Sequence, residues 1–155
     1  MNTSYKYTSR ASWTTGRAGI VNAESSVELP IAFSAPPEFH GQAGLWTPEH
    51  FLVAAVAGCY LTTFIAVAEL SKLELESLEV SATGSLEKGE GGFQFTRVTI
   101  RPVLTIARDS DRERALRLIE KAERSCLVSR SLRSEILVEP KVLVEAPILV
   151  SQMAS

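Results

Sequence analysis

The sequence predicts an α+β fold in which mainly antiparallel sheets wrap around one long, central apolar helix. Short segments with alternating or β-branched residues fill the start of the chain, and two longer segments of this kind follow later. Between them, residues 51–68 contain no formally charged side chain, which indicates a helix that is buried nearly all round. Strands, a long helix, a hairpin, a second helix and a last strand in this order are typical of an α+β domain.

The first strands are expected at 5–13, 19–23 and 27–33, with a turn at Thr14–Gly16. A helix then begins at Thr47–Pro48–Glu49, because a hydroxyl N-cap, a proline at the first position and an acid in the first turn all favour a start there. We expect this helix to run to about Ser71.

Two longer strands are expected at 75–87 and 93–106, joined by a glycine-rich hairpin turn at 88–92. The residues from Ser110 to Glu113 have the pattern of a capping box that opens a second helix. The apolar positions of that helix recur at helical spacing and place Cys126 at the end of its buried face. Residues 135–145 alternate as a last strand.

Composition and charge narrow the classes of function. A chain of 155 residues with 45% hydrophobic residues fits one domain, 1–155. A net charge of −2, with basic residues scattered, predicts neither a nucleic-acid nor a membrane partner. The first ten residues contain no apolar signal-peptide core, so we expect a cytoplasmic protein.

The apolar segment 51–68 is at the lower limit for a membrane span, but it stands alone without basic or aromatic anchors. A core helix, buried further in a homodimer, is the favoured interpretation.

Two cysteines far apart in the sequence do not make a disulfide-rich scaffold, and both thiols should be reduced in the cytosol. Each could be a small buried hydrophobe. Glu49 lies roughly 15 Å before Cys59 along one helix, so the two can meet only through a bend or a second copy of the chain. His40 and His50 match no zinc pattern with the cysteines, and no serine-hydrolase motif is present.

Three segments resemble the OsmC/Ohr family. The run from Leu45 to Cys59 is similar to the family's signature, in which a proline–glutamate pair opens a long helix that carries a reactive cysteine. The turn at Gly16–Arg17 is similar to the segment that supplies an active-site arginine, and the segment after Ser125 resembles that of the resolving cysteine. Leu127 stands where the family often has proline.

The resemblance implies an OsmC-like fold, an intertwined homodimer and a thiol-dependent peroxidase with a role in antioxidant stress response. Cys59 would attack an organic hydroperoxide, or hydrogen peroxide, and the resulting sulfenic acid would form a disulfide with Cys126. Arg17 would stabilise the thiolate and Glu49 would hold the arginine. No bound cofactor or metal is implied, only an external dithiol, lipoyl-type or other, as reductant.

Trp46, Phe51 and Leu127 are candidates for an apolar wall that favours organic peroxides, or are ordinary core residues. Two alternative functions stay open at this point. One is a hot-dog-type acyl-thioester enzyme, since that fold also wraps a sheet around a long helix. The other is a non-catalytic redox sensor or carrier of an apolar ligand, which would use the same disulfide without turnover.

Overall fold

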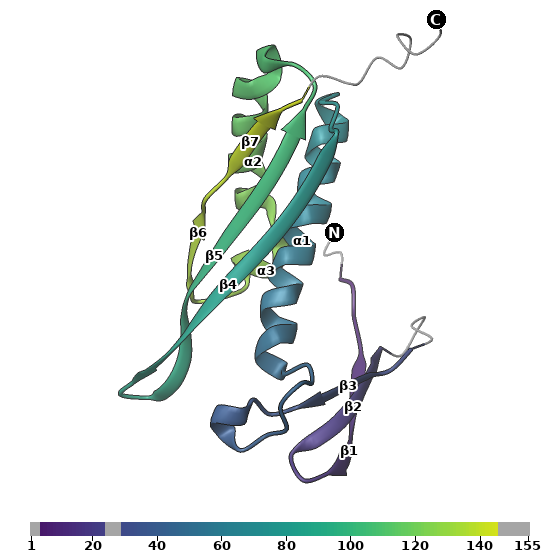
Figure 1. Cartoon of the computed structure of the whole chain (residues 1–155), viewed down its shortest axis with the longest axis vertical. Helices are drawn as coiled ribbons and strands as arrows, with labels where there is room; N and C mark the ends of the chain where they lie inside the picture. The colour runs from purple at the N-terminus through teal and green to yellow at the C-terminus, as the bar shows by residue number, and fades with distance from the viewer. Residues whose placement is uncertain (1–3, 24–28, 146–155) are drawn as a thin grey trace, which may run out of the picture. The chain divides into compact units, whose positions relative to one another are not determined.

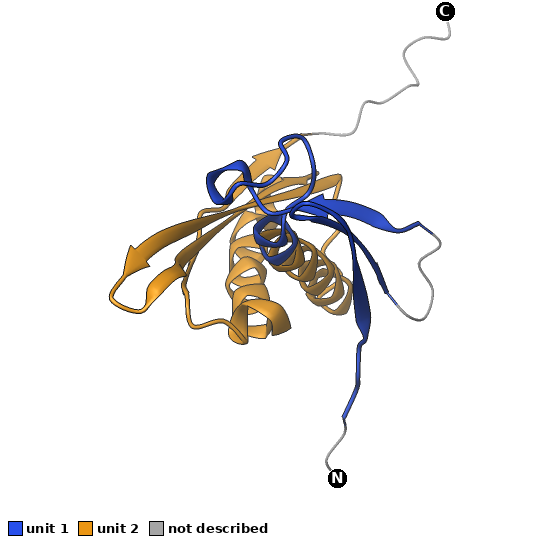
Figure 2. Cartoon of the chain, turned by 90° about the horizontal axis from the view of Figure 1, so that it is seen from below, with its two compact units in different colours: residues 1–52 blue, residues 53–155 orange. Residues whose placement is uncertain are grey.

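The computed structural model describes residues 4–23 and 29–145. The chain comprises two compact units, 1–52 and 53–155, drawn in different colours in Figure 2. The long helix α1 (Pro48–Leu70) begins in the first unit and continues through the second. Whether 1–155 folds as one domain stays a prediction, and each unit is described by itself below.

The first unit contains a three-stranded antiparallel sheet in the order β1-β2-β3 (Figure 1). Its strands are β1 (Ser9–Thr15), β2 (Ala18–Ala23) and β3 (Ile31–Ser34), and a short 3-10 helix η1 (Pro37–Phe39) follows. The predicted turn is confirmed at Gly16, whose φ of 53° is a left-handed conformation that favours glycine, but Thr14 and Thr15 belong to β1. The first strand starts later than expected because Ser9 pairs with Ala23, the last residue of β2. Residues 27 and 28 of the third predicted strand lie outside the described residues.

The second unit contains a four-stranded sheet built on a long antiparallel hairpin of β4 (Ser77–Gly89) and β5 (Gly92–Ile106) (Figure 1). The predicted hairpin turn is confirmed, with Gly92 at φ 101° where the chain returns. The sheets are thus mainly antiparallel, as expected, with parallel pairing only where the last segment joins β5.

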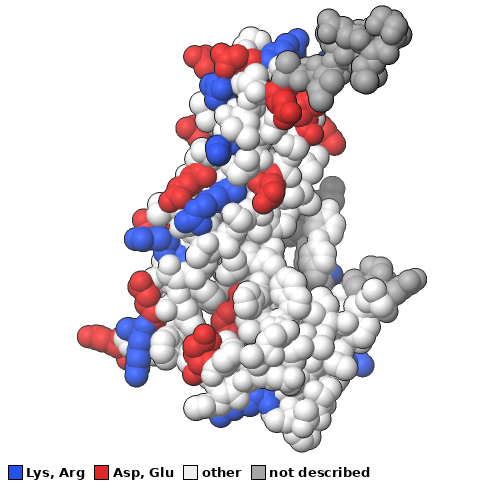
Figure 3. Space-filling view, viewed as in Figure 1, with Lys and Arg blue, Asp and Glu red and all other residues white. Residues whose placement is uncertain are grey.

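The single last strand predicted at 135–145 is wrong in one respect, because the segment forms two short strands. They are β6 (Glu135–Val138) and β7 (Lys141–Val144), both parallel to β5 and in the same register. Pro140 stands between them and has no N–H to donate, so the ladder is interrupted there. Arg101 Nε pairs with Glu139 Oε2 at 3.0 Å beside this gap. On the face shown in Figure 3, side chains of both signs are interspersed over this unit.

Both ends of helix α1 are capped by the residues that flank it. Thr47 Oγ1 accepts a hydrogen bond from the His50 N–H at 3.1 Å, so the predicted N-cap is confirmed. At the other end Lys72 has φ 54°, and the Lys72 and Leu73 N–H groups bond to the carbonyls of Glu69 and Ala68. This pattern is a Schellman motif in which lysine occupies the position usually taken by glycine.

The core of the second unit lies between α1, the sheet and α2 (Arg112–Ser125). The fully or nearly buried positions of α1 recur at helical spacing and are Val56, Tyr60, Phe64, Val67 and Ala68. By length and composition, with a hydropathy of 2.2, α1 could also cross a membrane, but a core helix passes the same test. The predicted buried face of α2 is confirmed at Ala115, Leu118, Ile119 and Ala122.

The capping box predicted at Ser110–Glu113 is wrong. A 3-10 turn, η2 (Asp109–Asp111), precedes α2, and the helix N-cap is Asp111 without a side-chain capping bond. Ion pairs take its place: Arg112 pairs with Asp109 at 2.9 Å, and Arg114 pairs with Asp111 at 3.0 Å. Charge pairs over three positions thus accompany the start of this helix, where no side-chain capping bond is made.

Candidate active site

Cys59 lies near the middle of α1, at the margin of its buried face. The adjacent helix positions Val56 and Tyr60 are fully buried, whereas Cys59 is half-buried and Gly58 is exposed. The Cys59 Sγ atom lies 4.0 Å from Oγ1 of Thr63, one helical turn further along. Cys59 is thus partly exposed, and a reactive cysteine needs some access to solvent.

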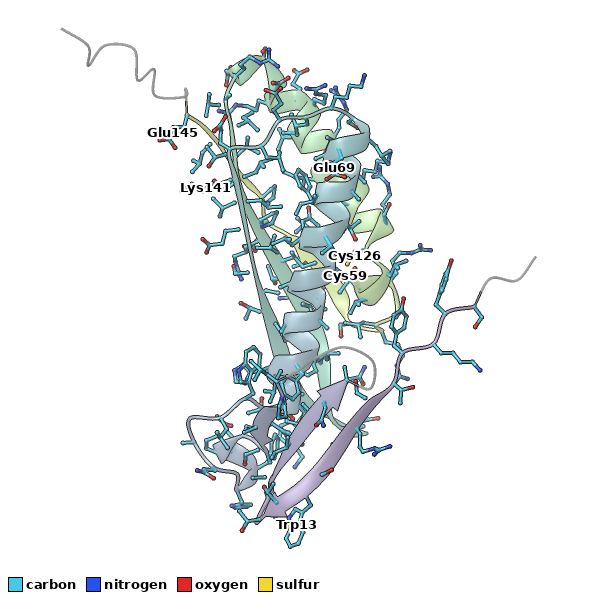
Figure 4. All side chains as sticks on the ribbon, turned by 90° about the vertical axis from the view of Figure 1, so that its right-hand side faces the viewer. Trp13, Cys59, Glu69, Cys126, Lys141 and Glu145 are labelled. Carbon is cyan, nitrogen blue, oxygen red and sulfur yellow. The ribbon has the colours of Figure 1, made fainter. Side chains whose placement is uncertain are left out.

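Cys126 is fully buried at the break between α2 and the short helix α3 (Leu127–Arg130). Its backbone is extended, with φ −65° and ψ 111°, and its carbonyl accepts the Ser129 hydroxyl at 3.2 Å and the Arg130 N–H at 3.1 Å. Figure 4 shows the side chains of Cys59 and Cys126 side by side. The structure thus brings together two predicted site residues that are far apart in the sequence.

The surroundings of Cys59 favour its thiolate. Burial raises the pKa of its thiol, but hydrogen bonds to the sulfur from the Val128 backbone, the Cys126 thiol and the Thr63 hydroxyl lower it, with a smaller contribution from the Leu127 backbone. The net pKa lies below the ordinary value for cysteine. Hydrogen bonds to the charged form therefore outweigh the cost of desolvation at this sulfur.

The surroundings of Cys126 favour its neutral thiol. Burial raises the pKa of Cys126, and hydrogen bonds with the Ser129 side chain and backbone lower it by less. Its hydrogen bond to Cys59 and the charge on Cys59 raise the pKa further. Of the two thiols, Cys59 therefore loses its proton more readily than Cys126.

A buried hydrogen bond ties the two cysteine-bearing helices together. The Tyr60 hydroxyl donates to the Ile119 carbonyl at 3.0 Å, joining α1 to α2 two turns before Cys126. Tyr60 is fully buried, and burial raises the pKa of its hydroxyl, with smaller contributions from the charges of Glu123 and Cys126. The group therefore stays protonated and serves as a permanent donor.

In the first unit, Arg17 follows Gly16 in the turn between β1 and β2. Its Nη1 donates to the Phe39 carbonyl at 2.7 Å, and its own carbonyl accepts the Ala35 N–H at 3.1 Å. The Trp13 indole donates to the Gly16 carbonyl at 2.9 Å. These hydrogen bonds hold the turn in place. The bond to Phe39 also fixes the guanidinium of Arg17, which keeps further N–H donors available.

Glu49 lies in the first turn of α1, where an acid is stabilised by the helix dipole. Its Oε2 atom is buried and accepts no hydrogen bond from the residues that the structure describes. No ion pair joins Arg17 to Glu49 within the described single chain. A buried carboxylate oxygen without a donor is costly.

Aromatic side chains of the first unit contact one another beside the first turn of α1. Trp46 stacks on Phe51 with centroids 5.6 Å apart, and Phe33 meets Phe51 edge-on at 5.9 Å. Trp46 remains about half exposed and lines a shallow depression of about 260 Å³ with Gly44, Leu45 and His50. The third candidate for the apolar wall, Leu127, belongs to the second unit and is 70% exposed, so it is not a core residue.

Comparison with known proteins identifies the family. A model of the OsmC-like protein family matches residues 41–141. The chain belongs to the OsmC-like family. An uncharacterized protein, YmaD of Bacillus subtilis, is 30% identical over 82% of this chain and 86% of its own length. An organic hydroperoxide resistance protein of Xanthomonas axonopodis pv. citri is 33% identical over 84% of this chain and 89% of its own.

The fold of the OsmC-like chain is also found in solved structures. An OsmC-like protein of unknown function from Vibrio cholerae has a TM-score of 0.79 at 21% identity, covering 88% of this chain and 99% of that one. The resemblance drawn from the sequence and the predicted α+β OsmC-like fold are therefore confirmed. Among residues 4–23 and 29–145, no group of three or more histidine, cysteine or acidic side chains is placed to hold a metal ion.

Two contributors to the OsmC-like site were not assigned a role from the sequence. Thr63 follows Cys59 by one helical turn, a spacing that was available in the sequence, but small polar residues at that spacing also serve plain helix packing. The backbone groups of Leu127 and Val128 carry no sequence signal, because any residue other than proline supplies an N–H.

Proposed function

We propose that this OsmC-like protein is a cysteine-based peroxidase that reduces organic hydroperoxides to alcohols. The observation that carries the proposal is the adjacent pair of thiols, of which Cys59 favours the thiolate and Cys126 the neutral form. The name of the Xanthomonas relative, an organic hydroperoxide resistance protein, supports the substrate class. We further propose that the protein acts in the cytoplasm.

In the first step the Cys59 thiolate attacks the terminal oxygen of the hydroperoxide. A sulfur–oxygen bond forms and the oxygen–oxygen bond breaks, so that Cys59 is oxidised to a sulfenic acid. The peroxide is reduced to an alkoxide, which leaves as an alcohol after it takes a proton from solvent or a nearby donor. A pKa below the usual value increases the fraction of Cys59 that is present as the reactive thiolate.

In the second step Cys126 attacks the Cys59 sulfur, a disulfide forms and the sulfur–oxygen bond breaks. The hydroxyl leaves as water with the proton that the Cys126 thiol gives up. The loss of charge on Cys59 helps this step, since the Cys59 hydrogen bond and charge are among the causes that raise the pKa of Cys126. Once Cys59 is a neutral sulfenic acid, its charge no longer raises the pKa of Cys126, whereas burial still does. The first step thus removes one obstacle to deprotonation of the resolving thiol.

An external dithiol, lipoyl-type or other, then reduces the disulfide and returns both thiols to the resting state. Two electrons enter with each dithiol, and two are used for each peroxide. In this cycle electrons pass only through the two cysteines and this reductant, so no bound cofactor is needed.

We propose that Arg17 stabilises the charge on Cys59 and on the peroxide oxygens, and that Glu49 pairs with a guanidinium. Two observations support this part: the unpartnered buried oxygen of Glu49 and the firmly braced turn of Arg17. Because Glu49 and Cys59 are roughly 15 Å apart along one helix, Glu49 would come from a second copy of the chain.

A homodimer is therefore part of the proposal. One face of α1 is exposed in the single chain and carries the charged Glu69 among small or apolar residues, namely Ala54, Ala55, Gly58, Thr62, Ile65, Ala66 and Leu70. Such a face allows close approach of another helix, and its burial would remove apolar surface from water. Trp46, Phe51 and Leu127 would line the path of an organic peroxide in that assembly.

The proposal is tested by replacing Cys59 with serine and following peroxide consumption with dithiothreitol as reductant. We expect the rate to fall to background, and a near wild-type rate would overturn the assignment to a cysteine peroxidase. Multiple turnovers by the wild-type protein would separate an enzyme from a redox sensor or a ligand carrier. Hydrolysis of acyl thioesters that persists in Cys59→Ser would favour a hot-dog-type enzyme instead.

Subunit sharing is tested by mixing Cys59→Ser chains with Glu49→Ala chains. Mixed dimers would regain one site in which both residues are intact, so activity should exceed that of either variant alone. A stable monomer with full activity, or verified mixed dimers without recovery, would contradict the shared site.

A further inference from the structure

Two consecutive threonines on α1 use their hydroxyl groups differently. Thr62 Oγ1 donates to the backbone carbonyls of Gly58 and Cys59, both at 3.1 Å. This bond back to the preceding turn is the usual choice for threonine inside a helix. Thr63 Oγ1 instead lies 4.0 Å from the Cys59 side-chain sulfur.

The position of Thr63 relative to Cys59 is fixed by the helix. Residues one turn apart lie on the same face, and the threonine side chain has few staggered conformations in a helix. Phe64 and Tyr60, which flank the pair on the core side, are fully buried, so the backbone of this turn has little freedom to move. Both Thr63 and Cys59 are half-buried, which limits competition from water.

The direction of the Thr63 hydrogen bond depends on the charge state of Cys59. When Cys59 is a thiol, either atom can donate. When Cys59 is a thiolate it has no proton, so the Thr63 hydroxyl must be the donor. A donor that is already in position when the charge forms costs little reorganisation, which is how a protein stabilises an anion efficiently.

We propose that Thr63 is a further catalytic residue, whose hydroxyl donates to the Cys59 sulfur anion that attacks the peroxide. This inference rests on the proposed function and adds to it a donor from the same helix as the nucleophile. It makes part of the thiolate stabilisation independent of Arg17 and of any second subunit. The hydrogen bond from Thr63 to Cys59 also contributes to the lowered pKa of the Cys59 thiol.

The test compares Thr63→Val, Thr63→Ser and Thr62→Val with the wild-type protein. Valine removes the hydroxyl and nearly keeps the shape, and serine restores the hydroxyl. Thr62→Val is the matched control, because it removes a hydroxyl from the neighbouring position that bonds only to helix carbonyls. The readout is the rate of iodoacetamide alkylation at Cys59 as a function of pH, with the modified residue identified by peptide mass.

For Thr63→Val we expect the alkylation midpoint to rise by about half to one pH unit, which corresponds to about 0.7–1.4 kcal/mol. The rate constant with cumene hydroperoxide below the midpoint should fall roughly three- to tenfold, in proportion to the thiolate fraction. Thr63→Ser and Thr62→Val should keep the wild-type midpoint. If valine prevents folding, Thr63→Ala removes the same hydroxyl and is interpreted in the same way.

An unchanged midpoint in folded Thr63→Val, or an equal rise in Thr62→Val, would overturn the inference. The alkylation experiment needs no peroxidase activity, so it separates the two proposals. A shifted midpoint in a protein that consumes no peroxide would support Thr63 as a donor and contradict the proposed function. Peroxide turnover with an unshifted midpoint would support the function and contradict the role of Thr63.

Discussion

Replacing Cys126 separates its two proposed roles, as hydrogen-bond donor to the Cys59 thiolate and as resolving thiol. Cys126→Ala removes both roles, whereas Cys126→Ser keeps an O–H donor at the same place and removes only the second thiol. Because the Cys126 thiol is one of the groups that lower the pKa of Cys59, alanine should raise that pKa and serine should leave it close to wild type.

The size of the effect follows from the type of bond. A hydrogen bond to a charged group contributes about 1.5 kcal/mol or more, which is about one pH unit in the midpoint of Cys59 ionisation. Below that midpoint the Cys59 thiolate fraction in Cys126→Ala falls about tenfold, and the first-step rate falls with it. Above the midpoint the two variants converge, because Cys59 is then deprotonated in both.

The assay is the pH dependence of Cys59 alkylation, followed by exposure of each variant to excess cumene hydroperoxide. Both variants should lose the disulfide and accumulate Cys59 with two added oxygen atoms, as a sulfinic acid. Equal midpoints for Cys126→Ala and wild type would refute the donor role. Protection of Cys59 from over-oxidation in both variants would refute the resolving role.

Three further predictions concern stability and specificity. Tyr60→Phe removes the buried bond to the Ile119 carbonyl and should lower the free energy of unfolding by about 1 kcal/mol, measured by urea denaturation; an unchanged value would mean that the bond adds nothing. Lys72→Gly should raise the melting temperature, because glycine adopts the left-handed conformation of this position at a cost about 1 kcal/mol lower than lysine does. A lower melting temperature would show that this conformation does not strain Lys72. If Trp46 and Phe51 line the entrance, cumene hydroperoxide should react with a higher second-order rate constant than hydrogen peroxide, and the opposite order would remove the apolar wall while leaving the thiol chemistry in place.

Local signals in the sequence predicted much of the fold. Thr47 and Pro48 fixed the start of α1 correctly, because an N-cap hydroxyl and a proline act through the nearest backbone groups. The glycine-rich segment before Gly92 predicted the hairpin for the same reason. The interruption of the last strand was missed, although Pro140 was visible in the sequence and cannot donate to a ladder.

The capping box at Ser110 failed because several local interactions compete at one helix end. The acids of η2 pair with arginines three positions away, and the N-cap position is taken by Asp111 and not by the serine. A motif of four residues does not show which of two such arrangements has the lower free energy.

The site was predictable in part. Helical spacing placed Cys126 at the end of a buried face, but the meeting of Cys59 with Cys126 depends on how α2 packs on α1. Such a contact between distant segments leaves no periodic trace, and the resemblance to the OsmC/Ohr family supplied it. The bond from Arg17 to the Phe39 carbonyl was not predictable, because a turn residue has no periodicity that sets the direction of its side chain.

The central claim is that Cys59 and Cys126 form one redox pair, and intact mass tests it most directly. The fully reduced protein is treated with one equivalent of cumene hydroperoxide, quenched with a thiol-blocking reagent, weighed intact and then digested. The account predicts the loss of two hydrogens, no blocked thiols, and a single cross-linked peptide pair that contains Cys59 and Cys126. An unchanged mass with both thiols blocked, or a stable added oxygen on Cys59 without a cross-link, would contradict it.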